Sequence, residues 1–315
     1  MSSLKNQKGM ALLLVLIIVS LLSALVIEFS FSTLVDLRAT ETFRDRTKAY
    51  YLARGGVEAA RTILQEDRND FDHPSEFWGN PLANIPAGDG DVSITITDLT
   101  GLLNVNFVAD KRGNPLPGYH RFVTLCEEVL LLDRLEVQQM ANSLVYWFDA
   151  DKTKTTPDDA YYANLHPPYH RRGDKLTILD ELKLIKGFDS QRFERLKPYI
   201  RVVGDEQINL NTAPAEVLYA WQFSAAEENV EIMLDRQDIV ALVDYRQQSA
   251  YLTLADLSMA EGIGERWSAA WVQNSVGVAG STYQVLSQGR INQGSRYAKA
   301  IVNKQGNKLL SFKVE

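Results

Sequence analysis

Four aspartates lie close together in the segment WFDADKTKTTPDDAYY, namely Asp149, Asp151, Asp158 and Asp159. Carboxylates at this spacing repel one another unless a cation or nearby basic side chains compensate their charge. Hard oxygen ligands on a loop suit Ca²⁺, which coordinates about six to eight oxygens. Thr153, between the two pairs, could add a hydroxyl or a carbonyl oxygen as a lesser ligand. The residue types therefore indicate a candidate calcium loop.

The same segment departs from the EF-hand pattern. Counted from Asp149, the sixth position is Lys154 instead of glycine, and the twelfth is Ala160 instead of glutamate. Lys152 and Lys154 could also neutralise the loop without any metal. On residue types alone, a calcium site and a solvated acidic loop both stay open.

Other residues offer little further chemistry. The single cysteine, Cys126, excludes an intrachain disulfide and a cysteine-based zinc site, and its apolar surroundings predict a buried, inert thiol. His166 and His170 are four positions apart, but the two prolines between them prevent the helix that would align them on a metal. The sequence contains no Gly-x-Ser-x-Gly and no phosphate-loop motif. An assembly component is therefore favoured over a membrane-tethered enzyme, which stays an alternative.

An apolar run at residues 10–27 decides where the chain resides. Eighteen helical residues span about 27 Å, close to the thickness of the hydrocarbon core of a bilayer. Lys5 and Lys8 precede the run, and acidic residues follow it from Glu28 onward. The positive-inside tendency therefore places the N-terminus in the cytoplasm and the bulk of the chain outside it.

A cleaved secretory signal is the alternative for this run. Such a signal would end at a small-x-small site, followed by a turn or a strand. Here apolar residues instead recur at helical spacing as far as Leu64, with charged residues on the other side. We therefore expect one helix from residue 10 to about residue 65, half in lipid and half in water, loosened at Gly55 and Gly56.

The remaining sequence predicts strands, then helices, then strands. Strict alternation predicts a strand at 91–97, followed after Gly101 by another extended piece through Val108. Helical spacing covers 122–148, and shorter helices are expected at 178–185, 190–196, 214–221, 235–247 and 254–258. Three strands are expected in the tail, at 281–291, 296–304 and 308–315. This order predicts an α+β fold class.

A second motif, INLNTAPAEVLYAW, reads as a helix start. Asn211 or Thr212 is expected to cap a helix that begins near Pro214, with Glu216 at its positive end. The alternative is a helix-hairpin-helix DNA-binding element, but its glycine hairpin would come about fifty residues too late, at Gly262. The net charge of −7 also gives no electrostatic attraction to nucleic acid.

The leader and the apolar run resemble those of type IV pilin-like precursors. In that class a short basic leader ends in glycine, and a prepilin peptidase cuts after it and methylates the new N-terminus. The resemblance implies cleavage between Gly9 and Met10, with Met10 N-methylated. The fifth residue after the cut is Leu14, where most pilin-like proteins have a glutamate that pairs with the amine of a neighbouring subunit. A subunit at the end of a fibre has no such neighbour ahead of it, so Leu14 fits a terminal position.

Several features in one order resemble a single family, the minor pseudopilin protein K of type II secretion. They are the leader, Leu14, the residues Asp98, Gly101, Asn104 and Asn106, the acidic loop, and INLNTAP. The family pattern W-x-D-x-D followed by an acidic residue, Asp, x and two tyrosines is known for binding calcium. The resemblance therefore implies calcium as a cofactor at the four aspartates, with Asp158 standing where glutamate is usual.

The resemblance also implies a fold, partners and a location. The expected fold is a pilin-like long N-terminal helix packed on an antiparallel sheet, with a large, mostly α-helical insertion. Its parts would be a leader at 1–9, a transmembrane half-helix at 10–27, the amphipathic helix and first part of the head at 28–108, the insertion at 109–279, and the C-terminal strands at 280–315.

The implied partners are the pseudopilins I and J in a tip complex, the other pseudopilins, and prepilin peptidase. The chain would cross the inner membrane once, with its bulk in the periplasm, and would bind no nucleic acid. A DNA-binding, competence-type pilin-like protein stays the alternative to this interpretation.

Overall fold

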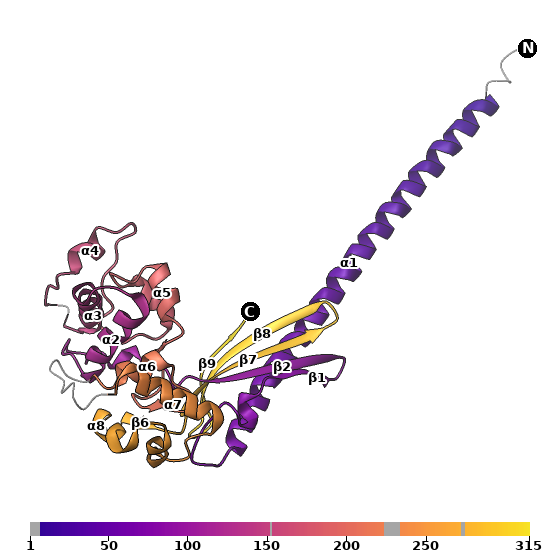
Figure 1. The fold of residues 1–315 in the computed structure, drawn as a ribbon. Coiled ribbons are helices and arrows are strands. Elements are labelled where there is room, and N and C mark those ends of the chain that lie inside the picture. The colour runs from indigo at the N-terminus through magenta and orange to yellow at the C-terminus, as the bar shows by residue number, and fades with distance from the viewer. Residues whose placement is uncertain (1–6, 152, 224–233, 272–274) are drawn as a thin grey trace, which may run out of the picture.

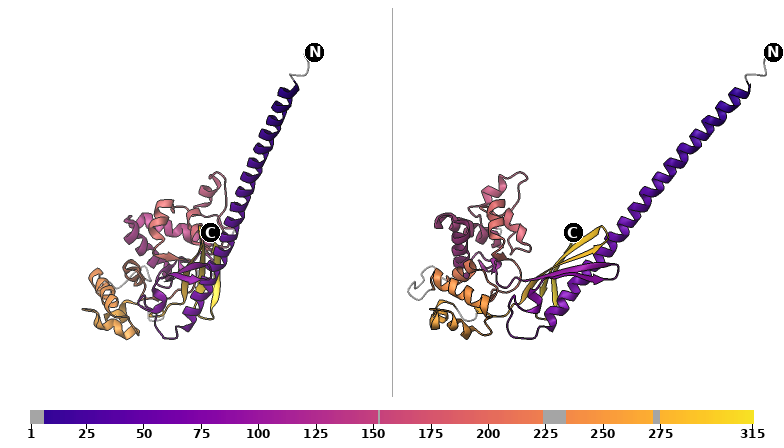
Figure 2. Two further views of the ribbon diagram at one scale, coloured as in Figure 1. Left: turned by 90° about the vertical axis from the view of Figure 1, so that its right-hand side faces the viewer. Right: turned by 45° about the vertical axis from the view of Figure 1, so that its right-hand side comes forward.

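A single long helix dominates the outline of the computed structural model, which describes residues 7–151, 153–223, 234–271 and 275–315 (Figure 1). Helix α1 (Gln7–Glu66) contains 60 residues. Its residues are exposed from Gly9 to Arg44, and burial begins at Asp45. The N-terminal part of α1 therefore extends away from the described remainder of the chain, as Figure 2 also shows. The continuous helix predicted from the sequence is confirmed, without a break at Gly55 and Gly56.

Five antiparallel strands form the sheet on which α1 packs, in the order β1-β2-β7-β8-β9. They are β1 (Leu82–Ala87), β2 (Gly90–Asp98), β7 (Thr282–Ile291), β8 (Gly294–Asn303) and β9 (Lys308–Val314). The sequence predicted all of these strands except β1. Strands β2 and β7 pair from Asp91 opposite Arg290 to Asp98 opposite Tyr283, which joins two distant parts of the chain.

Small and aliphatic side chains allow α1 to approach the sheet closely. The residues of α1 that are almost fully buried recur at helical spacing and are Ala49, Ala53, Val57, Ala60 and Leu64. At Gly56, a Cβ atom would lie 2.1 Å from Oγ of Ser287 in β7. The absence of a side chain at Gly56 therefore lets the helix pack closely against Ser287.

A second, mostly helical part with its own core lies between β2 and β7. Its helices are α2 (Pro117–Leu130), α3 (Arg134–Phe148), α4 (Asp159–Ala163), α5 (Ser190–Leu196), α6 (Ala215–Trp221), α7 (Arg236–Gln248) and α8 (Trp267–Ala270). Short 3-10 helices are η2 (Val105–Phe107), η3 (Leu179–Leu184), η5 (Leu254–Met259) and η6 (Gly264–Arg266), while η1 (Phe77–Gly79) follows α1.

Two short parallel pairs complete the helical part. They join β3 (Leu103–Asn104) to β4 (Ile200–Arg201), and β5 (Ile208–Asn209) to β6 (Val276–Gly277). The buried apolar residues of this part form one cluster, and those between α1 and the sheet form another. The predicted fold class, a long helix on an antiparallel sheet together with a mostly helical part, is confirmed.

Two expected segments have different bounds in the structure. The helical run at 122–148 is divided between α2 and α3, because Leu131 adopts a left-handed backbone with φ of 58° and Asp133 caps the start of α3. The extended piece through Val108 is also wrong, since β3 ends at Asn104. The side chain of Asn104 accepts a hydrogen bond from the backbone N–H of Asn106 at 3.1 Å, which turns the chain into η2.

The capping interpretation of INLNTAP is wrong as well. Pro214 precedes α6, and no side-chain cap closes that helix. Instead, the amide of Asn211 donates to the backbone carbonyl of Tyr251 at 2.9 Å, and the hydroxyl of Thr212 donates to Oδ2 of Asp98 at 2.7 Å. Thr212 therefore ties the helical part to the end of β2, and Asn211 joins two segments within the helical part.

Candidate anchor and cation-binding loop

The N-terminal part of α1 has the length and composition of a membrane-spanning helix. Its most apolar stretch has a mean hydropathy of 3.1, and none of it is buried inside the molecule. The hydroxyl of Ser20 donates a hydrogen bond to the backbone carbonyl of Leu16 at 2.8 Å, so this polar group is satisfied within the helix. Gly9 and Met10 lie within α1, whereas the first six residues of the predicted leader lie outside the described residues.

The acidic loop begins where α3 ends, with Asp149 as the first residue past the helix. A guanidinium from a later segment lies against the loop backbone. Arg171 donates to the carbonyls of Asp149 and Asp151 at 2.7 Å each and to that of Lys154 at 2.8 Å. Arg171 is only 6% exposed, so these hydrogen bonds are largely shielded from water. Arg171 therefore acts as an internal cation that closes the loop.

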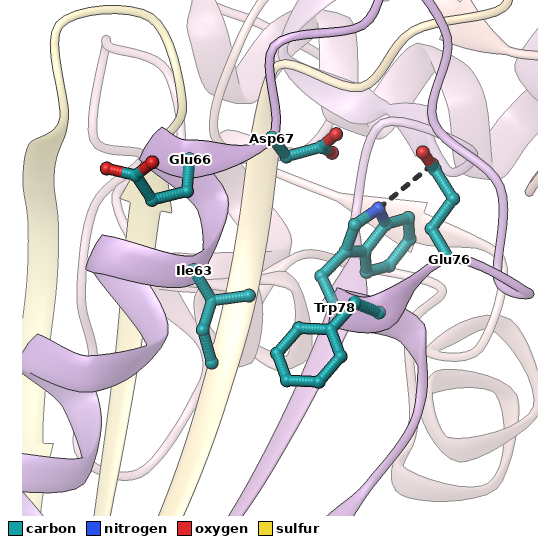
Figure 3. A pocket seen from close by; sticks show the side chains of 6 residues that line it. Ile63, Glu66, Asp67, Glu76 and Trp78 are labelled. Atoms are coloured by element: carbon teal, nitrogen blue, oxygen red, sulfur yellow. Dashed lines mark hydrogen bonds between the residues drawn. The ribbon is translucent and has the colours of Figure 1, made fainter.

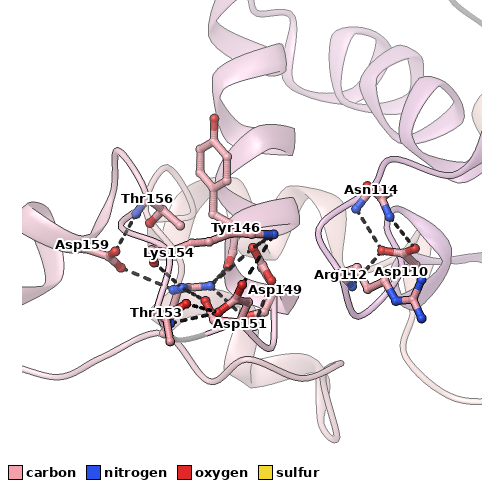
Figure 4. Close-up of polar contacts among 11 residues, drawn as sticks. Asp110, Arg112, Asn114, Tyr146, Asp149, Asp151, Thr153, Lys154, Thr156 and Asp159 are labelled. Atoms are coloured by element: carbon pink, nitrogen blue, oxygen red, sulfur yellow. Dashed lines mark hydrogen bonds and ion pairs between the residues drawn. The ribbon is translucent and has the colours of Figure 1, made fainter.

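The first two aspartates of the loop are linked to each other. Oδ1 of Asp149 accepts the backbone N–H of Asp151 at 2.9 Å, and Nζ of Lys154 lies 3.8 Å from both carboxylates (Figure 4). Thr153 donates its hydroxyl to Oδ1 of Asp151 at 2.6 Å. This bond, the Thr153 backbone N–H and the neighbouring positive charges hold the pKa of Asp151 below its usual value.

The other two aspartates have separate partners. Oδ1 of Asp158 accepts a hydrogen bond from Nζ of Lys186 at 2.7 Å. Asp159 accepts the backbone N–H of Thr156 at 2.6 Å through Oδ2, and its Oδ1 lies 3.5 Å from Nε of Arg171. The structure therefore places the four aspartates in one loop but engages them with three different cations.

Two buried oxygen atoms at this loop, Oδ2 of Asp158 and Oγ1 of Thr156, have no hydrogen-bond partner among the residues that the structure describes, which leave out Lys152. A buried oxygen left unpaired is costly, and a hard cation would satisfy it. The donor set therefore fits calcium chemically. Thr153 donates its hydroxyl hydrogen to Asp151, which leaves the lone pairs of this oxygen available to a cation.

Sequence reasoning missed both long-range cations of the loop. Arg171 comes three residues after a pair of prolines, and Lys186 comes two residues after η3, so neither position carries a local pattern that points to the loop. The buried thiol was predicted correctly. Cys126 is fully buried, and burial raises its pKa.

Comparisons with known proteins agree with this architecture. A family model described as "Type II secretion system (T2SS), protein K" matches residues 101–205, a range that contains the acidic loop and Arg171. Type II secretion system protein K of Klebsiella pneumoniae is 29% identical over 217 residues, which are 66% of this chain and 67% of that protein. The protein of the same name from Pseudomonas aeruginosa is 24% identical over 311 residues, 93% of each chain.

This chain is similar to type II secretion system protein K, in one relative over 93% of its length. The resemblance inferred from the sequence is therefore confirmed. A solved structure also shares the fold, namely a chain of "the GspK-GspI-GspJ complex from enterotoxigenic Escherichia coli", with a TM-score of 0.68 and 16% identity over 89% of this chain and 99% of that one. The chain is a pseudopilin of a protein transport system, and α1 is its N-terminal apolar helix.

Proposed function

We propose that this protein K is a minor pseudopilin at the tip of the pseudopilus, where it starts and caps the fibre that exports folded proteins from the periplasm. Leu14 is the observation that carries the proposal. It lies on the exposed face of a helix whose first acidic residue is Glu28. An acid at this depth would need a partner amine on a subunit ahead, and a subunit at the tip has none.

The proposed partners are the pseudopilins I and J. The solved complex contains chains named I and J beside its K chain, which has the same fold as this protein. The helical part stands to one side of α1 in Figure 1 and in the right view of Figure 2, so the head is much wider than the helix. A head of this width would clash with a subunit stacked above it, which favours the tip position over a place inside the fibre.

A secretion assay with matched anchor variants tests this function. In a strain that lacks its own protein K, the chain should restore export, and proteins should otherwise collect in the periplasm. Leu14→Glu and Leu12→Glu place a carboxylate on the same exposed run, near its N-terminal end, at a similar cost that is below the roughly 3 kcal/mol of a charge at the membrane centre. Both variants should impair export alike. A gain of export specific to Leu14→Glu would show that the position requires an acid and would contradict the tip role.

The anchor is proposed to be processed and oriented as in other pilin-like proteins. Cleavage after Gly9 by prepilin peptidase would leave Met10 as the N-methylated first residue, with the N-terminus in the cytoplasm and the head in the periplasm. Gly9 supports this proposal, because it is exposed and no atom lies near the position of a Cβ there. The fold therefore does not cover the peptide bond between Gly9 and Met10. The proposed membrane is the inner membrane.

The acidic loop is proposed to bind calcium. Asp149, Asp151, Asp158 and Asp159 would hold the ion through carboxylate oxygens, since Arg171 already occupies the loop carbonyls. The unpaired oxygens of Asp158 and Thr156 support this assignment. When bound, the ion would supply positive charge that lowers the repulsion among the carboxylates.

A further inference from the structure

A cavity of about 360 Å³ lies at the C-terminal end of α1. In Figure 1 this end of α1 lies far from α3 and α4, the two helices that the acidic loop connects. Its lining combines carboxylates with apolar side chains (Figure 3). The lining residues are Ile63, Glu66, Asp67, Glu76, Phe77 and Trp78. A cavity of this size can hold one long side chain together with a few waters.

Negative charge in this cavity exceeds the positive charge that faces it. Carboxylate oxygens of Asp67, Asp72 and Glu76 lie within 4.8 Å of one another. Lys304, the first residue after β8, supplies one ammonium, 3.0 Å from Asp67 and 2.7 Å from Asp72. The guanidinium of Arg68 lies 4.0 Å from the carboxylate of Glu66, and both side chains are exposed. Burial and the charges of Glu76 and Asp72 still raise the pKa of Asp67, despite Lys304. The cluster therefore retains uncompensated negative charge that a further cation would relieve.

Glu76 is held in place by neutral donors. Its Oε2 accepts the backbone N–H of His73 at 2.7 Å and the indole N–H of Trp78 at 3.1 Å, and its Oε1 accepts the amide of Asn69. Among the residues that the structure describes, no ion pair joins Glu76 to a basic side chain. This carboxylate is fixed in position, and a cation is the partner it lacks.

Aromatic surface lies next to these carboxylates. Phe77 is 66% exposed, while Trp78 is almost fully buried against Tyr283, with ring centroids 5.3 Å apart. The turn that carries both is tightly built, because a Cβ at Gly79 would lie 2.1 Å from the carbonyl oxygen of Pro74. An exposed aromatic side chain beside fixed carboxylates suits a guanidinium, which stacks on rings and binds two carboxylates at once.

We propose that this cavity binds an arginine side chain presented by a partner protein. The guanidinium would lie between Glu76 and Asp67, and its aliphatic stem would contact Phe77. A metal ion fits less well, because Lys304 already lies between Asp67 and Asp72 and would have to be displaced.

The position of the cavity determines which partners can reach it. It lies about 55 Å along α1 from the end of the apolar run, at the opposite pole from the anchor. A periplasmic protein that approaches the tip of the fibre would meet this pole first. This last step rests on the proposed function, whereas arginine binding itself does not.

The test uses full-length protein in detergent micelles, labelled with 5-fluorotryptophan. The fluorine resonance of Trp78 is assigned by its loss in Trp78→Phe, and the probe is the blocked tripeptide acetyl-Gly-Arg-Gly-amide. The same peptide with citrulline, which has the shape of arginine without its charge, is the control ligand. We expect a saturable shift of the Trp78 resonance with the arginine peptide and none with the citrulline peptide.

Substitutions separate a specific site from general attraction to an acidic protein. Glu76→Gln should weaken binding at least tenfold, since it keeps the shape of the side chain and removes its charge. Glu194→Gln, at an exposed carboxylate on α5, should leave binding unchanged. Equal shifts with both peptides, an unaffected Glu76→Gln variant, or no shift at all would overturn the proposal.

Two further outcomes are also decisive. A shift produced by Mg²⁺ or Ca²⁺ but not by the arginine peptide would make the cavity a metal site and refute arginine binding. Because the measurement needs no other pseudopilin, a negative result would leave the tip assignment untouched. Failure to assemble with I and J would equally leave a positive arginine result intact.

Discussion

The guanidinium of Arg171 donates to the backbone carbonyl of Asp149 across 2.7 Å, which joins the segment after the prolines to the end of α3. The same side chain also bonds the carbonyls of Asp151 and Lys154. Three carbonyls on one guanidinium require its planar fork, which an ammonium cannot reproduce. The loop therefore has a permanent cation of its own, and a metal would add to this cation instead of replacing it.

Replacing Arg171 should destabilise the helical part. Arg171→Met should lower the free energy of unfolding by about 3–5 kcal/mol, because it leaves buried carbonyls and Asp149 without their cation. Arg171→Lys should cost less but remain above about 1 kcal/mol, because the fork is lost. Chemical denaturation of the full-length protein in detergent measures both effects.

The neighbouring Arg172 provides the matched control. It is more exposed and pairs with Glu181 at the surface. Arg172→Lys should change stability by less than about 1 kcal/mol. If Arg171→Lys and Arg172→Lys lowered the free energy of unfolding equally, the contacts of Arg171 with the loop would contribute no extra stability.

Calcium removal should lower the thermal midpoint of the full-length protein. An ion present at about 100 times its dissociation constant adds roughly 2.7 kcal/mol of stability. The shift between calcium and chelator should disappear in Asp149→Ala with Asp151→Ala, and also in Asp158→Asn, which removes the charge of the carboxylate that carries the unpaired Oδ2. Asp110→Asn, at an exposed carboxylate in a neighbouring turn, should retain the full shift (Figure 4).

An identical melting curve with and without chelator would contradict calcium binding. The loop would then be closed by Arg171, Lys154 and Lys186 alone. Scanning calorimetry of the four proteins distinguishes these outcomes.

Substitution of Gly9 should block processing without disturbing the fold. Nothing lies within 4 Å of a Cβ at this position, so Gly9→Leu meets open space. The variant should accumulate as a precursor nine residues longer than the mature chain, without the added methyl group. Intact-protein mass spectrometry measures both changes, and Gly55→Ala, another open position, should give the normal mature mass. A normal mature mass for Gly9→Leu would place the processing site elsewhere.

The buried carboxylate of Asp98 should make stability fall as pH rises. Asp98 accepts hydrogen bonds from the Thr100 backbone and from the side chains of Asn209 and Thr212, yet burial raises its pKa above the usual value. Between the ordinary aspartate pKa of about 4 and this raised pKa, the folded state binds more protons than the unfolded state. The contribution of Asp98 is therefore fully present below about pH 4 and is lost as pH rises through the folded pKa.

Asp98→Asn removes this titration. The difference in unfolding free energy between wild type and Asp98→Asn should therefore shrink from about pH 4 upward, in urea titrations at a series of pH values. Asp89→Asn serves as the opposite control, because Lys48 lowers the pKa of that exposed aspartate. A difference for Asp98→Asn that grew with pH would show that the hydrogen bonds outweigh the burial.

Much of the fold could be predicted because its local patterns are regular. In β2, Val92, Ile94 and Ile96 alternate with exposed residues, since one face of the strand packs on α1. The long helix was also evident from its apolar spacing. The break at Leu131 was not, because leucine rarely adopts a left-handed backbone and nothing in the run of leucines signals the turn.

The candidate sites were harder to predict, because their contacts are distant in sequence. The four aspartates of the loop are visible as a cluster, but their buried partner Arg171 is brought in by the path of a proline-containing segment. The carboxylate cluster at the end of α1 pairs with Lys304, which is more than 230 residues from Asp72. Side-chain chemistry can be read from a sequence, whereas such pairings depend on the folded chain.

Assembly with the other minor pseudopilins tests the central claim most directly. The full-length chain would be purified in detergent with the I-type and J-type pseudopilins of the same system, and the mass of the eluted species would be determined by light scattering. A stable complex with one copy of each protein is the expected result. Elution of this chain alone, in the presence of calcium and with both partners folded, would contradict its place in a tip complex.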